Sequence, residues 1–104
     1  MADEIDVTVV TLRFRASDPG RLVPVLAKYV VLSRGHHGCR NIDFCASVND
    51  PDTFVVIEKW ETPSAQRAHF DSDEMVEMAV ACRGLLQGPP AIDLLTGISA
   101  HDLT

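Results

Sequence analysis

Near the N-terminus, the apolar positions change from a two-residue repeat to a helical one. Residues 5–15 alternate with apolar side chains at both parities, which predicts a strand with two apolar faces. The segment SDPGR ends this strand. A helix is then expected from Gly20 or Arg21 to about Gly35, because that start leaves Pro24 in the first turn, where proline is tolerated. Its apolar stripe consists of Leu22, Val25, Leu26, Tyr29 and Val30.

The rest of the chain reads as two strands, two helices and a last strand. Strands are predicted over residues 39–47 and 53–61, and the turn NDPD joins them as a hairpin. Thr62 before Pro63, and Ser72 before two acidic residues, are helix start signals. They predict a short helix over 63–70 and a longer one over 73–86, before a strand over 91–98. The longer helix has an apolar stripe formed by Met75, Met78, Ala79, Cys82 and Leu86.

This order of elements is that of the ferredoxin-like βαββαβ fold, in the α+β class, with a four-stranded antiparallel sheet. Residues 1–104 are expected to form one domain, since so short a chain cannot hold two cores. Right-handed crossovers are taken to place the first and third strands side by side and parallel in the centre. Both helical segments are then expected on one face. The other face of the central strands is also apolar, so we expect a homodimer that packs sheet against sheet.

Composition narrows the classes of partner. The net charge is −6 and basic residues are scattered singly, which argues against nucleic acid. No apolar run is long enough for a membrane helix and no secretory signal is visible, so a cytoplasmic protein is expected. Cys39, Cys45 and Cys82 lack paired spacing, which favours reduced thiols over disulfides. His36, His37 and Cys39 lack a second ligand pair, so we interpret GHHGC as a loop with solvated histidines rather than a metal site.

Glu58 interrupts an otherwise apolar strand and marks a candidate site. It shares one face of that strand with Trp60, and His69 lies on the short helix that follows. Because the first and third strands are expected to be parallel and to end at one edge, Arg13 should lie there too, giving an apolar pocket with a cation, a carboxylate and an imidazole. Structural alternatives exist for each residue. In these alternatives, Glu58 forms an ion pair with Arg13 or Arg15 on the neighbouring strand, Trp60 is a core residue, and His69 donates a hydrogen bond to free carbonyls at the end of its helix.

The same residues carry a resemblance to a known family. PGR after the first strand, GC entering the second, the run NDPDTFVVIEKWETPSAQRAHFDSDEM and the terminal strand together resemble the antibiotic biosynthesis monooxygenase domain, a family of quinol monooxygenases and dimeric α/β-barrel enzymes. The resemblance spans nearly the whole chain. Its most specific part is Glu58, Trp60, Ala65 and His69, with the DP turn at residues 50–51.

The resemblance implies a cofactor-free monooxygenase that oxidises a hydroquinone or a polyketide-type aromatic with O2, as a homodimer without metal, flavin or haem. An electron-rich phenolate can itself pass an electron to oxygen, so the protein need only bind the aromatic, remove a proton and stabilise the anion. On this hypothesis His69 is the base or proton shuttle, Arg13 steadies the anion and Glu58 orients a donor. The residues expected to contact the aromatic substrate are Phe14, Trp60, Phe70 and Met75.

Other functions remain open at this point. Relatives in the same superfamily degrade haem with an Asn on the first strand, where this chain has Arg13, and with a histidine ligand about one residue from the position of His69. Others isomerise small phosphorylated sugars or lactones. A third possibility is a dimer that binds an apolar metabolite without catalysis, because one fold hosts many functions.

Overall fold

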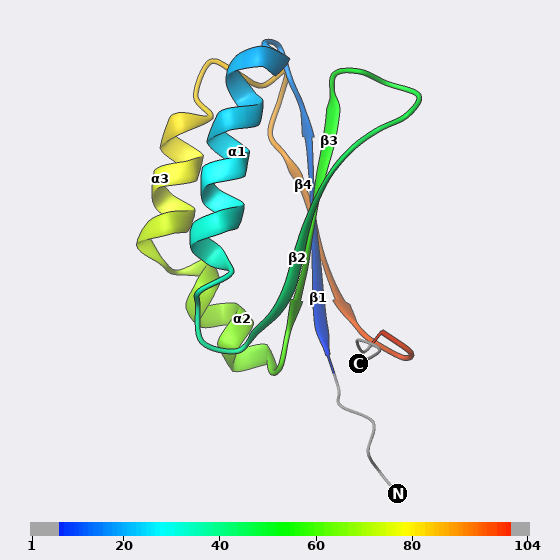
Figure 1. Ribbon diagram of the computed structural model, residues 1–104, viewed down its shortest axis with the longest axis vertical. Helices are drawn as coiled ribbons and strands as arrows, with labels where there is room; N and C mark the ends of the chain where they lie inside the picture. Colours follow the sequence, from blue (N-terminus) through cyan, green and yellow to red (C-terminus); the bar gives the residue numbers. More distant parts are fainter. Residues whose placement is uncertain (1–6, 101–104) are drawn as a thin grey trace, which may run out of the picture.

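The helices lie on one face of a four-stranded sheet (Figure 1). The computed structural model describes residues 7–100 of the chain. Its elements are, in chain order, β1 Thr8–Arg15, α1 Pro19–Ser33, β2 Cys39–Ala46, β3 Thr53–Trp60, α2 Pro63–Phe70, α3 Asp73–Ala81 and β4 Ala91–Thr96. The strands are arranged in the order β2-β3-β1-β4. This is the predicted ferredoxin-like α+β arrangement. Among residues 7–100, no helix is both long and apolar enough to cross a membrane.

The direction of the central strands differs from the sequence prediction. β1 and β3 lie side by side but run antiparallel, with Thr8 opposite Trp60 and Arg13 opposite Val55. The reason is the β2–β3 hairpin. The α1 crossover returns β2 in the direction of β1, and β3 then turns back and inserts between them, antiparallel to both. The prediction that β1 and β3 are parallel and end at one edge is therefore wrong.

Local signals account for most element boundaries. Asp18, Thr62 and Ser72 cap the starts of α1, α2 and α3 with their side chains, as N-cap residues do. Helix α3 ends at Ala81, earlier than predicted, and Leu86 instead forms an isolated bridge with Ala16. Ile5, at the start of the predicted first strand, lies outside the described residues.

The core lies between the helices and the inner face of the sheet. Val10, Leu12 and Phe14 of β1 point inward and are buried against Leu22 and Leu26 of α1. Strand β4 is different, because all six of its residues are exposed. The helices thus cover β1 and β3 well, bury Ile42 of β2 and leave the β4 edge partly open.

The outer face of the sheet carries apolar and charged residues together. The register places Val9, Val55 and Ile57 on this face beside Arg13 and Lys59. The predicted apolar character of this face is therefore only partly observed. Its three central apolar side chains are half-buried in the single chain.

Gly38 allows β2 to start against α2. Its φ is +79°, in the region that favours glycine, and a Cβ built there would lie 2.5 Å from the Cβ of Ala65. The carbonyl of Gly38 also accepts a hydrogen bond of 2.8 Å from the amide of Glu61. This glycine therefore holds the end of β3 and the start of α2 against the loop that follows α1.

We expect Gly38→Ala to lower the free energy of unfolding by about 2–3 kcal/mol, because backbone strain and overlap with Ala65 add together. Two other glycines allow the effect of backbone strain to be measured apart from the effect of overlap with a neighbouring side chain. Gly84 has φ +78° with open space around it, whereas Gly88 has open space without a positive φ. Gly84→Ala should therefore cost about 1 kcal/mol and Gly88→Ala close to nothing in urea unfolding. Equal losses in Gly38→Ala and Gly84→Ala would contradict the close approach.

Candidate functional site

A buried carboxylate forms the centre of the candidate site. Glu58 is 1% exposed and points to the helix side of β3. Its Oε1 accepts a hydrogen bond of 3.0 Å from Trp60 Nε1, and its Oε2 accepts one of 2.6 Å from the hydroxyl of Tyr29. A buried charge is tolerated only when such donors compensate it, so Glu58 depends on both.

His69 completes the inner cluster. Its Nε2 lies 2.7 Å from the Tyr29 hydroxyl oxygen and 3.6 Å from Glu58 Oε1. Its ring stacks on Trp60, with ring centroids 4.5 Å apart and planes inclined by 25°. His69 is 3% exposed and Trp60 fully buried. The imidazole therefore lies against the aromatic face that the sequence analysis assigned to a substrate.

The cluster continues outward through a second histidine. His36 Nδ1 lies 2.9 Å from His69 Nδ1, and His36 Nε2 lies 3.0 Å from Glu74 Oε1. The side chains of His36 and Glu74 are 22% and 33% exposed. An unbroken series of hydrogen bonds thus leads from buried Glu58 to the surface.

These residues meet because several elements begin or end at the same end of the molecule. Tyr29 lies in the last turns of α1, Glu58 and Trp60 near the end of β3, and His69 in the last turn of α2. Glu74 lies in the first turn of α3, and His36 in the loop between α1 and β2. Figure 1 shows this end, where α2 lies below the ends of α1 and α3 and close to the sheet.

Burial and charge shift two pKa values in the cluster. Burial, together with the neighbouring charge of Glu58 and the hydrogen bond to it, raises the pKa of Tyr29 far above its usual value. Its phenol is therefore neutral. Hydrogen bonding to its own backbone amide, and more weakly to His36, lowers the pKa of Glu74. Glu74 is therefore ionised at neutral pH.

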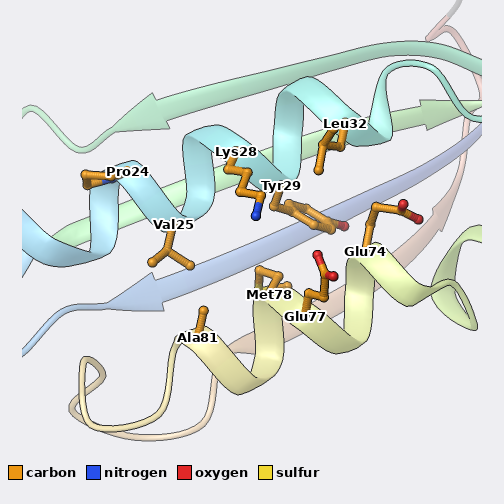
Figure 2. Close-up of a pocket in the computed structure, with 9 residues that line it drawn as sticks. All are labelled: Pro24, Val25, Lys28, Tyr29, Leu32, Glu74, Glu77, Met78 and Ala81. Carbon is orange, nitrogen blue, oxygen red and sulfur yellow. The ribbon is translucent and has the colours of Figure 1, made fainter.

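A pocket of ≈ 300 Å³ lies between α1 and α3, and Tyr29 lies at its inner side (Figure 2). Val25 and Met78 provide apolar walls. Lys28, Glu74 and Glu77 supply its charged groups. Figure 2 shows the Lys28 amine pointing from α1 toward α3. The pocket therefore combines apolar walls, a cation and a hydroxyl that contacts the buried acid–base pair.

A second, apolar groove lies on the other side of α3. It has a volume of ≈ 330 Å³ and runs between α3 and β4. Phe14, Phe70 and Met75, which were predicted to bind the substrate, all line it, whereas Trp60 does not. Its only titratable lining residue is Cys82, whose pKa is raised by burial.

Arg13 does not join the predicted catalytic set. It is exposed on the outer sheet face, where it lines a separate hollow with Arg15 and Gln87. The antiparallel register also places it five residues along β1 from Thr8, the residue opposite Trp60. Convergence of Arg13 with Glu58 is therefore wrong, and so is the alternative ion pair between Glu58 and Arg13 or Arg15. Glu58, Trp60 and His69 do lie together.

Sequence reasoning missed Tyr29, His36 and Glu74 as site residues. Tyr29 was assigned to the core stripe of α1, and its signal was a hydroxyl among aliphatic residues, since a buried tyrosine usually needs a hydrogen-bond partner. His36 does lie in the predicted loop, but it is only partly exposed, because its ring contacts His69 and Glu74. His37, its neighbour, is exposed. Within residues 7–100, no group of three or more His, Cys, Asp or Glu side chains is arranged to hold a metal, and the three cysteines are free.

These features define a ferredoxin-like α+β protein with a buried acid–base cluster beside a small apolar pocket. Residues 7–81 match the family model for antibiotic biosynthesis monooxygenase. The chain belongs to this family.

Solved structures share the fold at low sequence identity. Rv0793 from Mycobacterium tuberculosis is 22% identical with a TM-score of 0.82, covering 92% of this chain and 99% of its own. PA3566 from Pseudomonas aeruginosa is 23% identical, with a TM-score of 0.80 and coverages of 95% and 100%. SnoaB, a cofactor-independent oxygenase from Streptomyces nogalater, is 19% identical, with a TM-score of 0.80 and coverages of 91% and 96%. No curated protein matches the chain significantly.

The environment of Tyr29 predicts a measurable pH dependence. Because its pKa is raised on folding, the neutral phenol is favoured in the folded state. Its contribution to stability is constant below about pH 10, the unfolded value, and falls as pH rises above it. Tyr29 is the only tyrosine and Trp60 the only tryptophan of the chain. Phenolate absorbance should therefore appear only together with loss of native tryptophan emission.

Tyr29→Phe supplies the control for this titration, because it should abolish the phenolate signal. A phenolate that forms near pH 10 while tryptophan emission stays native would contradict the buried environment.

Proposed function

We propose that this protein is a cofactor-free monooxygenase that oxidises an electron-rich phenolic aromatic, a hydroquinone or a polyketide-type aromatic, with O2. In this reaction one ring carbon exchanges its hydrogen for a carbonyl oxygen and one hydroxyl loses its proton. The second oxygen atom leaves as water with those two hydrogens. The substrate supplies all the electrons, so no external reductant is needed.

The observation that carries this proposal is Tyr29, which lines the α1–α3 pocket and donates its hydroxyl hydrogen to Glu58. A carboxylate only accepts hydrogen bonds, so the single Tyr29 proton points to Glu58. A substrate hydroxyl in the pocket can give its proton to the Tyr29 oxygen as the Tyr29 proton passes to Glu58 Oε2. Glu58 then acts as the base through Tyr29, and His69 serves as the proton shuttle.

The pocket offers one cation for a phenolate, Lys28, beside the carboxyl groups of Glu74 and Glu77. Its volume lies at the lower end of the range for small-molecule sites, which favours an aromatic of few rings. Lys28 takes the role of stabilising the anion that the sequence analysis gave to Arg13. Trp60 orients Glu58 and His69 rather than contacting the substrate. Family membership, and the cofactor-independent oxygenase SnoaB among the structural neighbours, support the same reaction class.

Both ring nitrogens of His69 lie within hydrogen-bond distance of protein partners, Tyr29 and His36. Ligation of a haem iron by His69 would require one of these contacts to break. This observation favours the cofactor-free reaction over haem degradation.

The proposal is tested by oxygen uptake of chelator-treated protein with reduced quinones and anthrones, after subtraction of the non-enzymatic rate. We expect saturable uptake that falls by about 10²-fold or more in Glu58→Gln, because the amide cannot accept the proton. Glu61→Gln, an exposed change three residues further on, should leave the rate unchanged. Absence of saturable uptake in the wild-type protein would refute the function.

Two matched substitutions locate the substrate. Val25→Phe narrows the α1–α3 pocket and should raise KM sharply, whereas Val76→Phe narrows the α3–β4 groove and should not. The reverse result would move the substrate to the groove lined by Phe14, Phe70 and Met75.

A homodimer that packs the open sheet faces together is part of the proposed function. Val9, Val55 and Ile57 form an apolar strip on this face, and basic and acidic side chains lie on the same face. A second copy turned about a two-fold axis would bury the strip and allow opposite charges to pair.

We therefore expect Ile57→Glu to convert dimer to monomer in sedimentation equilibrium, because it places a charge within the buried strip. Val31→Glu, on the exposed side of α1, is the control and should remain dimeric. An Ile57→Glu protein with unchanged mass would exclude this interface.

A further inference from the structure

We propose that Tyr29, His69, His36 and Glu74 form a proton relay that connects buried Glu58 with solvent. The proposal deepens the proposed function, because the proton to be exported is the one that Glu58 takes from the substrate. The relay itself consists only of protein groups, so it can be tested without a substrate.

The geometry is continuous from the interior to the surface. Successive distances along the series are 2.6, 2.7, 2.9 and 3.0 Å, all within hydrogen-bond range. Exposure rises along it from 1% for Glu58 to a third of the side chain for Glu74. No side chain has to move for neighbouring groups to exchange a proton.

Both carboxylate oxygens of Glu58 already accept a hydrogen bond, and only one of the two donors can pass a proton on. Oε1 faces Trp60 Nε1, and an indole N–H only donates. Oε2 faces Tyr29, whose hydroxyl both donates and accepts. Oε1 also lies 3.6 Å from His69 Nε2, which is beyond hydrogen-bond distance. The hydrogen-bonded exit for a proton on Glu58 is therefore the Tyr29 oxygen.

When Glu58 is ionised, the position of each hydrogen along the series follows from which groups can only accept a hydrogen bond. Tyr29 then donates to Glu58, so its oxygen accepts from His69 Nε2–H. His69 Nδ1 is free of hydrogen and accepts from His36 Nδ1–H. Since Glu74 is an acceptor, His36 also carries hydrogen on Nε2 and is the cation of the series.

Reversing three hydrogen bonds moves one proton. In the reversed arrangement protonated Glu58 donates to Tyr29, Tyr29 donates to His69 Nε2, and His69 Nδ1–H donates to His36 Nδ1. His36 is then neutral and still donates to Glu74 through Nε2–H. Both arrangements contain the same hydrogens, and passage from the second to the first transfers one proton from Glu58 to His36.

The outer end of the relay is built to release that proton. His36 and His69 line an open cavity of ≈ 490 Å³ on the surface, next to exposed His37. The carboxylate of Glu74 accepts from His36 Nε2 and would stabilise a proton on that ring, and both side chains are partly exposed to solvent. The proton thus leaves toward the cavity at His36 rather than into the α1–α3 pocket, although Tyr29 and Glu74 belong to the relay and also line that pocket.

The first experiment measures exchange of the buried His69 ring proton with solvent by NMR on histidine-labelled protein without substrate. We expect His36→Ala to slow this exchange by about tenfold or more, because water in the open cavity is a much weaker proton acceptor than an imidazole. Added imidazole, which fits the open cavity, should restore the wild-type rate. His37→Ala, the adjacent exposed histidine, should exchange as the wild type does.

Two results would overturn the relay: unchanged exchange in His36→Ala, or slowed exchange that imidazole does not restore. The second would assign His36 a structural role only. His36→Gln provides a second variant of similar size if the alanine protein does not keep native Trp60 emission. Its exchange should also be slow.

The second experiment measures oxygen uptake and separates the relay from the proposed function. In His36→Ala, kcat should fall by about 10²-fold with KM unchanged, and imidazole should restore it. Glu74→Gln should show a smaller loss of kcat, and Asp73→Asn, its exposed neighbour, none. If the wild-type protein takes up no oxygen but its His69 exchange depends on His36, the oxygenase is refuted and the relay is retained. If the protein takes up oxygen but its His69 exchange does not depend on His36, the relay is refuted and the oxygenase is retained.

Discussion

The carboxylate of Glu58, buried under the helix layer, is the constraint on which the rest of the site depends. Removing a charge from water is costly unless hydrogen bonds replace the lost hydration. One donor, Trp60 Nε1, comes from the same strand two residues later, and the other, the Tyr29 hydroxyl, comes from α1. Tyr29 and His69 thereby fix α1 and α2 relative to β3, which apolar packing alone would specify less closely.

This constraint also explains why the polar cluster lies at one end of the sheet. The antiparallel course of β3 brings its last residues beside the start of β2 and the end of α1. Gly38 keeps the loop between them short and close to Ala65. Helix ends, rather than strand faces, then supply His69 and Glu74. The opposite end of the sheet, where Arg13 lies, is instead joined to the segment that follows α3, for example by the hydrogen bond from the Gln87 amide to the Arg15 carbonyl.

The sequence allowed prediction of the features that depend on local signals. Caps at Thr62 and Ser72 and the NDPD turn gave the order of elements, and strand parity placed Glu58 with Trp60. Strand direction was misjudged because it depends on how the hairpin inserts beside β1, and Arg13 was misplaced as a result. Tyr29 and His36 lie 40 and 33 residues from His69, so no local pattern shows that they touch it.

The closed packing of the cluster has a chemical consequence. Trp60 and His69 stack on one another in the interior, so a substrate in the α1–α3 pocket meets Tyr29 first. The raised pKa of Tyr29 means that this residue does not hold a negative charge itself. In the proposed reaction it passes the charge change to Glu58, which Trp60 and His69 stabilise away from water. A reactive anion would then form in the pocket without admitting water to the base, because Glu58 is 1% exposed and is reached through Tyr29.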